Sequence, residues 1–281
     1  MSGELDPHYV VARSVLLDVL EALGPQWKAI ILVGAQAIYL HTGAIDLAVP
    51  EFTTDADITI DPTLLQELPE IESAMRAAGF DRGRRVGAWV VVRDIDGVPM
   101  EVEVDLMVPE AVGGIGRRAA RLAGHAKEVA RKARGLEAAL IDKGTATIAA
   151  FEATDTRSFA IAVAGPAALI VAKLHKIIER LSERERRRLD DKDALDLLRL
   201  LQATATEGLA STFVRLLKAD VAREVTHEAL TALRDLFADP QGAGTQMAVR
   251  AAGALVSADE IAGSCAVLAT DLLRAVDTRK P

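Results

Sequence analysis

Two aspartates stand two residues apart in the stretch TTDADITID, at the start of a run that alternates as a β-strand. Side chains at positions i and i+2 of a strand point to the same face, so Asp55 and Asp57 would project together. Two like charges so close raise each other's pKa unless a cation lies between them. Carboxylate oxygens suit Mg²⁺, which proteins hold through a few carboxylates together with substrate phosphates. A solvated pair at a strand end is the alternative, and the pair alone favours it.

A third acidic residue lies in the stretch EVEVDLM. Its period-2 pattern places apolar residues on one face and acidic residues on the other: Val102, Val104 and Leu106 against Glu101, Glu103 and Asp105. A half-exposed amphipathic strand explains the two glutamates but explains Asp105 less well, because Asp is unfavourable within strands. Asp105 is therefore a candidate third metal ligand. Two ions held in this way can stabilise the attacking and leaving oxygens of a phosphoryl displacement.

Two further features could bind phosphate. In LVGAQA an apolar strand runs directly into Gly34 and a short helix, and backbone N–H groups at such a turn can bind phosphate. In the stretch 172–201, basic residues follow i, i+3, i+7 spacing on one helix and two acidic residues follow i, i+3 spacing on the next: Lys173, Lys176 and Arg180, then Asp193 and Asp196. Surface charge on helices explains each of these residues when it is taken alone.

These residues need a sheet and helices to position them. Short apolar or alternating runs predict strands at 28–33, 56–60, 88–95, 98–108, 145–153 and 158–164. Helical spacing predicts a helix at 8–23, a short one after Gly34, and a helix or broken pair at 62–79, with a loop at 44–53. From Pro166 onward the pattern is helical throughout, at 166–183, 190–203, 208–219, 222–238 and 245–276. We therefore expect an α+β domain with a mixed sheet over residues 1–163 and an all-α domain over 164–281.

Composition limits the class of protein. The 281 residues carry a formal net charge of −8, half are hydrophobic and only 4% are aromatic, so the core must consist of aliphatic residues. A single cysteine, Cys265, excludes a disulfide framework within one chain. The first ten residues lack the pattern of a secretory signal, and no apolar run reaches membrane-spanning length. We expect a cytoplasmic protein with no membrane association.

One basic stretch stands out in this acidic chain. Residues 114–135 contain seven Lys or Arg and one Glu, directly after the strand that carries Asp105. Such a concentration of charge could follow a phosphate backbone, although the stretch has no aromatic residue on which bases could stack. A solvated amphipathic helix or a loop is an equal alternative.

Taken in order, Gly34, Asp55-Ala-Asp57 and Asp105 resemble the pattern of the nucleotidyltransferases of the DNA polymerase β superfamily. More narrowly, the chain resembles the AbiEii and MenT-type nucleotidyltransferase toxins of bacterial toxin–antitoxin systems. The stretches VAGPAALIVAKLHKI and DKDALDLLRLL match that group in order and spacing. The resemblance covers roughly residues 28–201.

The resemblance implies a nucleotidyltransferase-like fold and a metal-dependent enzyme that uses an NTP and releases pyrophosphate. Asp55, Asp57 and Asp105 would bind Mg²⁺ or Mn²⁺, and Asp105 would also help to deprotonate the acceptor hydroxyl. The helical domain would contribute two catalytic residues, Lys173, which neutralises the triphosphate, and Asp193, for which Asp196 is the alternate. Nucleotide contacts would come from Gly34, Ala35, Lys173 and Lys176. The implied acceptor is tRNA, and a cognate antitoxin is an implied partner.

Two departures from the superfamily pattern bear on these expectations. Ala35 stands where the superfamily usually has Gly or Ser, and the gap from Gly34 to Asp55 is longer than usual. Three hypotheses therefore stand: transfer to RNA, transfer to a protein or small molecule, or a catalytically silent member that only binds a partner. Neither the identity of the NTP nor the oligomeric state follows from the sequence.

Overall fold

A computed structural model of the chain describes residues 5–43, 53–95, 97–182, 191–253 and 256–279. The chain divides into two compact units, which we call the sheet unit and the helical unit. The sheet unit comprises Met1–Ala37, Glu51–Ala133 and Lys143–Ala164. The helical unit comprises Ile38–Pro50, Arg134–Asp142 and Gly165–Pro281. Two short segments, 38–50 and 134–142, thus belong to the helical unit although they precede residue 163 in the chain.

The sheet unit is built on a mixed sheet, with eight strands among its described residues. They are β1 (Ile30–Val33), β2 (Asp55–Ile60), β3 (Asp81–Arg82), β4 (Ala88–Ile95), β5 (Val98–Pro109), β6 (Arg131–Ala133), β7 (Lys143–Ala149) and β8 (Ser158–Ala164). The order is β3-β4-β5-β2-β1-β8-β7, and β6 pairs with β5. The pairs β1/β8, β2/β5 and β5/β6 are parallel, and the others are antiparallel.

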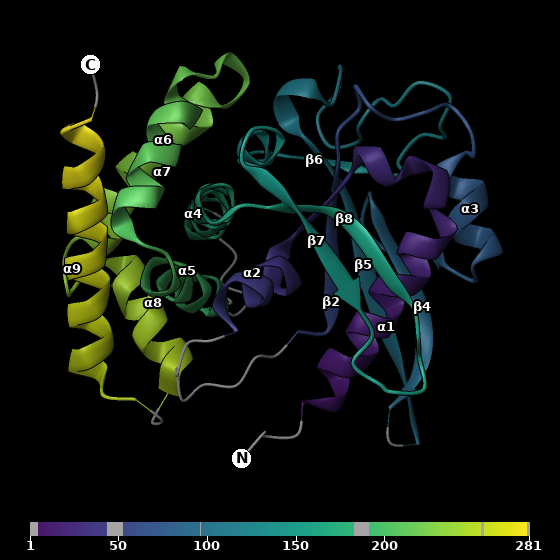
Figure 1. Cartoon of the computed structure of the whole chain (residues 1–281), viewed down its shortest axis with the longest axis horizontal. Helices are drawn as coiled ribbons and strands as arrows, with labels where there is room; N and C mark the ends of the chain where they lie inside the picture. The colour runs from purple at the N-terminus through teal and green to yellow at the C-terminus, as the bar shows by residue number, and fades with distance from the viewer. Residues whose placement is uncertain (1–4, 44–52, 96, 183–190, 254–255, 280–281) are drawn as a thin grey trace. The chain divides into compact units, whose positions relative to one another are not determined.

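One face of this sheet is apolar and packs on helix α1 (Pro7–Ala22). Asp6 caps α1 by accepting a hydrogen bond from the His8 backbone at 2.8 Å. On the same face, Arg93 of β4 donates to Asp18 of α1 at 2.7 Å. Helix α3 (Ile71–Ala77) lies beside α1 (Figure 1). Because side chains alternate along a strand, the residues that follow the opposite register face away from α1.

The β4–β5 hairpin forms where the sequence predicts it. Gly97 takes a φ of +81°, and its backbone N–H donates to Asp94 Oδ1 at 2.8 Å. A positive φ suits glycine in a tight hairpin turn, and the carboxylate of Asp94 stabilises that turn. Asp96, the other predicted turn residue, lies outside the described residues.

The helical unit contains a 3₁₀-helix and six described α-helices (Figure 1). They are η3 (Leu136–Leu140), α4 (Pro166–Ser182), α5 (Lys192–Ala203), α6 (Thr206–Lys218), α7 (Asp220–Phe237), α8 (Ala243–Ala252) and α9 (Ala258–Asp277). Helix α4 packs on α5 and α7, and α9 packs on α6 and α8. Helix α2 (Gly34–Thr42) begins in the sheet unit and ends in the helical unit.

The predicted fold class is confirmed: the protein is α+β, with a mixed sheet, flanking helices and a helical C-terminal region. Two predicted helices have different bounds. Within 62–79 only α3 is helical, because residues 61–70 form turns around two prolines. The predicted helix at 245–276 is two helices, α8 and α9, and α8 ends at Gly253, whose φ is +61°.

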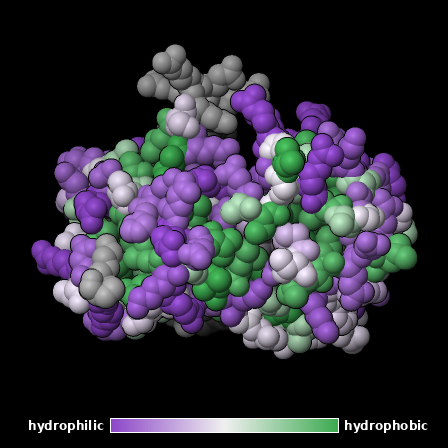
Figure 2. Space-filling view, turned by 90° about the horizontal axis from the view of Figure 1, so that it is seen from above, coloured by the Kyte–Doolittle hydropathy of each residue, from purple (hydrophilic) through white to green (hydrophobic). Residues whose placement is uncertain are grey.

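The surface mixes polar and apolar side chains. Figure 2 shows hydrophobic groups among hydrophilic ones on the face that it draws. In the sheet unit, Leu68 and Ile115 are the most exposed large apolar residues, at 75% and 90%. None of the described helices combines the length and the apolar character that crossing a bilayer requires.

Candidate functional site

The predicted carboxylates meet on neighbouring strands of the sheet unit. In the parallel pairing of β2 with β5, Asp57 is the Cα partner of Asp105, and Asp55 is the partner of Glu103. Partners in a parallel ladder share a face, so these four carboxylates lie on one side of the sheet, opposite the side that packs on α1. Sequence spacing alone did not assign Glu103 to this cluster. We call Asp55, Asp57, Glu103 and Asp105 the carboxylate cluster.

Gly34 closes one side of the carboxylate cluster. Val33 of β1 pairs with Asp57, and Gly34 follows directly with a φ of +69°. A Cβ atom added to Gly34 would lie 2.0 Å from Asp57 Oδ2, well inside van der Waals contact. Only glycine satisfies both the backbone conformation and this contact. Ala35 follows in the first turn of α2 and is buried.

A hydrogen-bonded chain from α1 positions Asp55. The Gln36 side chain donates to the carbonyl oxygens of Ala12 at 3.2 Å and Asp55 at 3.3 Å, and it accepts from Arg13 Nε at 2.8 Å. Thr53 Oγ1 donates to Asp55 Oδ1 at 2.6 Å. These contacts fix the first residue of β2. Sequence reasoning missed them, because they join segments that are far apart in the chain.

Strand β5 changes its neighbour beside Asp105. On one edge, β4 pairs with β5 as far as Ala88, the partner of Asp105, and β6 takes over with Arg131 opposite Met107. Gly87, at a φ of +80°, fills the junction, and its carbonyl accepts from the Leu106 N–H at 2.8 Å. Arg131 shares the face of Met107 and Asp105, so the change of neighbour aims its side chain at the carboxylate cluster.

Two arginines offset part of the negative charge of the cluster. Asp105 Oδ2 lies 3.2 Å from Arg131 Nη2 and 3.6 Å from Arg85 Nη2, and Arg85 also donates a hydrogen bond to Glu103. Burial lowers the pKa of the Arg85 guanidinium, but the charges of Asp105, Glu103 and Asp57 outweigh burial and raise that pKa. Asp105 Oδ1 and Arg131 Nε are buried and have no hydrogen-bond partner within the described residues. An unsatisfied buried carboxylate oxygen is costly, and ligation is one way to satisfy it.

The oxygen donors of these residues fit a divalent cation by their chemistry. The donors are hard oxygens on adjacent strands, and the orphaned Asp105 Oδ1 is a ready ligand. In the described part of the chain, however, no three His, Cys, Asp or Glu side chains are grouped so that they could ligate one ion. Asp105 Oδ2 is occupied by Arg131 and Arg85. Asp105 Oδ1, which has no hydrogen-bond partner within the described residues, is the oxygen left for ligation.

Lys173 lies in the helical unit and is shared by two aspartates. Its Nζ donates to Asp193 Oδ1 at 2.7 Å and to Asp196 Oδ2 at 2.8 Å, and Asp196 also accepts from Arg199 at 3.1 Å. Lys173, Asp193 and Asp196 are all buried. Burial lowers the pKa of Lys173, but the charges and hydrogen bonds of the two aspartates outweigh it and raise that pKa. Asp196 is therefore a second partner of Lys173 together with Asp193, rather than its alternate.

Asp193 also pairs with the two other predicted basic residues of α4, Lys176 and Arg180. Its Oδ2 lies 2.8 Å from Arg180 Nη1, and its Oδ1 lies 3.7 Å from the more exposed Lys176 Nζ. Burial raises the pKa of Asp193, but Lys173, Lys176 and Arg180 outweigh it and lower the pKa to about 2. The predicted i, i+3, i+7 row on α4 therefore converges on one buried carboxylate.

The basic stretch 114–135 is mostly irregular rather than helical. Gly114, Gly116 and Gly124 take positive φ values, which interrupt helical structure, and the stretch ends in β6 beside β5. Its exposed basic side chains within the sheet unit are Arg117, Arg118, Arg121 and Lys127. Lys132 instead donates to the Gly114 carbonyl at 2.9 Å, so it ties the stretch to itself. The exposed charges therefore lie on a loop whose two ends are held by β5 and β6.

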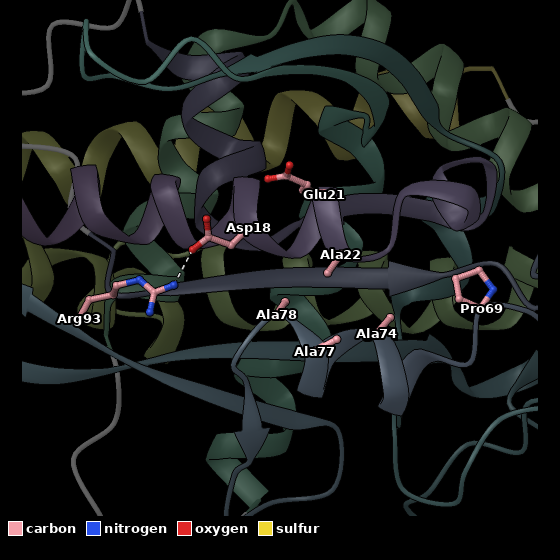
Figure 3. Close-up of a pocket in the computed structure, with 8 residues that line it drawn as sticks. All are labelled: Asp18, Glu21, Ala22, Pro69, Ala74, Ala77, Ala78 and Arg93. Carbon is pink, nitrogen blue, oxygen red and sulfur yellow. Dashed lines mark hydrogen bonds and ion pairs between the residues drawn. The ribbon is translucent and has the colours of Figure 1, made fainter.

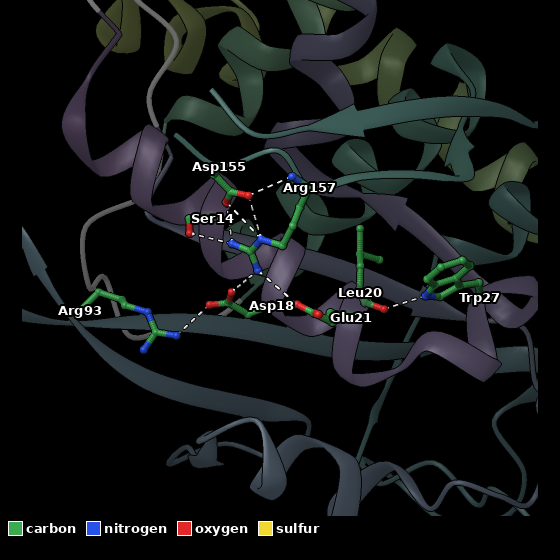
Figure 4. Close-up of polar contacts among 8 residues, drawn as sticks. All are labelled: Ser14, Asp18, Leu20, Glu21, Trp27, Arg93, Asp155 and Arg157. Atoms are coloured by element: carbon green, nitrogen blue, oxygen red, sulfur yellow. Dashed lines mark hydrogen bonds and ion pairs between the residues drawn. The ribbon is translucent and has the colours of Figure 1, made fainter. Parts of the chain in front are cut away.

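A groove of about 590 Å³ opens elsewhere on the sheet unit (Figure 3). It lies along α1 and α3 and is lined by Asp18, Glu21, Ala22, Pro69, Ala74, Ala77, Ala78 and Arg93. Figure 4 shows Asp18 between Arg93 and Arg157, which donate at 2.7 Å and 2.5 Å. No predicted site residue lines this groove, and the ion pairs of Asp18 tie α1 to β4 and to Arg157, the residue before β8. We therefore assign the groove a structural role and keep the carboxylate cluster as the candidate site.

The predicted loop at 44–53 lies, except for Thr53, outside the described residues, as does the charged stretch 183–190. No protein-family model and no curated protein matches the chain.

Proposed function

We propose that the chain is a metal-dependent nucleotidyltransferase that transfers an NMP from an NTP to a hydroxyl group of an RNA. The observation that carries this proposal is the register of β2 with β5, which sets Asp57 beside Asp105 while Gly34 packs on Asp57. Three carboxylates next to a glycine turn are the arrangement that the motif order predicts for such an enzyme.

Asp55, Asp57 and Asp105 would hold the divalent cations, Mg²⁺ or Mn²⁺. When bound, such ions supply Lewis-acid stabilisation of the charge on the phosphates. In the transfer, the acceptor oxygen bonds to the α-phosphorus and the bond from that phosphorus to the β-bridging oxygen breaks, so pyrophosphate leaves. Asp105 takes the hydroxyl proton in this proposal, and the N–H groups at Gly34 and Ala35 bind phosphate oxygens.

The exposed basic residues of 114–135 support RNA as the acceptor. Arg117, Arg118, Arg121 and Lys127 are exposed on a loop that begins just after β5, the strand that carries Asp105. Rows of exposed arginine and lysine bind a phosphate backbone without reading its sequence. Transfer RNA is the specific acceptor that we test, because the sequence resemblance implies it. A role for the chain as the toxin of a toxin–antitoxin pair rests on the same resemblance.

The test is a transfer assay with the full chain. Each α-labelled NTP is incubated with the chain, Mg²⁺ or Mn²⁺, and bulk tRNA, and the label in RNA is measured. In a parallel reaction lysate protein replaces tRNA, and the label in protein is measured. We expect label in RNA, and a loss of at least 100-fold in Asp57→Asn. The matched control is Asp61→Asn, which changes an aspartate at the other end of β2 whose Oδ1 accepts from Thr63 in a turn.

Three outcomes contradict the proposal in different ways. Label in protein but not in RNA would mean that the acceptor is a protein, while the chain would still be a nucleotidyltransferase. Equal labelling by Asp57→Asn and the wild type removes the carboxylate cluster from the reaction. If no NTP gives label and no NTP binds in the presence of metal, the proposed enzymatic activity is rejected. That result favours a protein that only binds a partner.

A further inference from the structure

The carboxylate cluster and its arginines carry an uneven charge. Four carboxylates, Asp55, Asp57, Glu103 and Asp105, face two guanidiniums, Arg85 and Arg131, so the formal charges of these groups sum to −2. A divalent cation at these carboxylates would compete with the arginines for the same oxygens, because like charges so close repel strongly. One or both arginines must therefore yield when a cation binds.

The two arginines differ in how firmly they are held. Arg131 belongs to β6, its side chain is 28% exposed, and its backbone is paired with β5. Arg85 lies in the turn between β3 and β4, and its side chain is 60% exposed. The backbone of that turn is pinned, since Gly83 N–H donates to the Ala88 carbonyl at 2.8 Å and Gly87 N–H to the Glu128 carbonyl at 3.1 Å. Only the side chain of Arg85 is therefore free to change partners at little cost.

We propose that Arg85 is an exchangeable cation of this site, which pairs with Asp105 and Glu103 in the empty site and turns to the phosphates of the nucleotide once a divalent cation has taken the carboxylates. This inference rests on the proposed function and adds a substrate-binding residue to it. Arg131 keeps its contact with Asp105 Oδ2 throughout and acts as a positioning residue that leaves Oδ1 for ligation.

The chemistry of arginine favours this exchange. A guanidinium presents a planar fork of donors that matches phosphate as well as carboxylate geometry. The loaded site offers the guanidinium such a second role, because the triphosphate brings further negative charge that attracts it after a divalent cation has taken the carboxylates. An arginine that only paired with the carboxylates of the empty site would oppose metal binding and would make no favourable contact in the loaded site. An arginine that then contacts phosphate replaces the ion pairs that it loses with the carboxylates by ion pairs with the nucleotide.

The test measures two affinities that the exchange moves in opposite directions. Mn²⁺ binding to the nucleotide-free full chain is titrated by electron paramagnetic resonance. Binding of non-hydrolysable α,β-methylene NTP analogues at saturating Mn²⁺ is measured by calorimetry. For Arg85→Ala we expect Mn²⁺ to bind about three- to tenfold more tightly, because a competing charge has gone. We expect the analogue to bind at least tenfold more weakly, because a phosphate contact has gone.

Three variants make the result specific. Arg85→Lys keeps the charge and is expected to restore both affinities towards those of the wild type. Arg84→Ala removes the neighbouring exposed arginine and is expected to change neither affinity. Asp57→Asn is expected to weaken Mn²⁺ binding, which reports on the metal site independently of Arg85. Thermal unfolding of each variant checks that the fold is retained.

Arg85→Ala weakening both affinities would overturn the exchange and make Arg85 a structural residue. Arg85→Ala changing neither affinity would reduce it to a solvated surface charge. In both cases, weaker Mn²⁺ binding by Asp57→Asn than by the wild type would still support the proposed function. An Asp57→Asn variant that binds Mn²⁺ as the wild type does would instead remove the metal site and this inference with it.

Discussion

Gly34 and Asp57 are packed so closely that no side chain fits between them. The Asp57 carboxylate would lie within 2.0–2.7 Å of a Cβ at Gly34, and the backbone of Gly34 is left-handed. The glycine therefore fixes where the carboxylate stands relative to the start of α2. It does so by leaving space rather than by making a bond.

Replacing Gly34 with alanine tests this packing. The positive φ should cost about 1–2 kcal/mol of unfolding free energy, and the contact with Asp57 should cost a further ~1–3 kcal/mol. Gly79→Ala is the matched control, because Gly79 has a φ of +84° and nothing within 4 Å of its added Cβ. Urea unfolding of both variants separates the two costs. Equal destabilisation in the two variants would show that the contact with Asp57 adds nothing.

Removing the Lys173 ammonium should destabilise the helical unit strongly. Lys173→Met leaves Asp193 and Asp196 buried without their shared cation, and breaking a buried pair typically costs about 3–5 kcal/mol. Lys176→Met removes a cation that contacts the same Asp193 from an exposed position, and it should cost no more than about 1 kcal/mol. Chemical denaturation of both variants measures the difference. Similar losses in the two variants would contradict the role that we assign to burial.

Asp193 should make stability depend on acid pH. Its folded pKa of about 2 lies below the ordinary value of 3.8, so its contribution is fully present above about pH 4 and is lost as the pH falls towards 2. The depressed pKa corresponds to about 2 kcal/mol. The measurement is the unfolding free energy of the wild type and of Asp193→Asn between pH 6 and pH 2. The gap between them should close in the window from pH 4 to pH 2, and a gap that stays constant would refute the assignment.

Neutralising the basic loop should weaken RNA binding in a way that depends on salt. Arg117, Arg118 and Arg121 changed together to Gln should reduce the slope of log affinity against log salt by on the order of 2. The control is the same change at Arg215, Arg223 and Arg234, arginines of the helical unit that are also exposed. Filter binding of tRNA across a salt series gives both slopes. An unchanged slope in the loop variant would place RNA binding elsewhere.

Alternation and apolar runs were enough to predict the fold class. The hairpin of β4 with β5 followed from period-2 patterns around an Asp-Gly turn, and the helical C-terminal region followed from its periodicity. Predicted bounds failed where a local break outweighed a periodic pattern, as at Gly253, where one predicted helix is two. The turns at 61–70 likewise shortened a predicted helix to α3.

The carboxylate cluster was only partly predictable. Spacing put Asp55 beside Asp57, but the partner of Asp57 is set by strand pairing with Asp105, which lies far along the chain. Arg131 could not be found, because β6 has three residues and carries no periodic signal. Arg85 could not be found either, since its role depends on where a turn places one exposed side chain.

The change of neighbour along β5 also separates the strands that carry the carboxylates from the basic stretch that follows β5. Residues 110–130 leave the sheet after Pro109 and rejoin it at Arg131, so both ends of this insertion are held by the same strand. The register of Asp105 with Asp57 is set by the pairing of β2 with β5, to which residues 110–130 contribute no partner. In the enzyme that we propose, the exposed part of this insertion could change in sequence while the carboxylates stay in place, so its variation among related chains would report on acceptor choice.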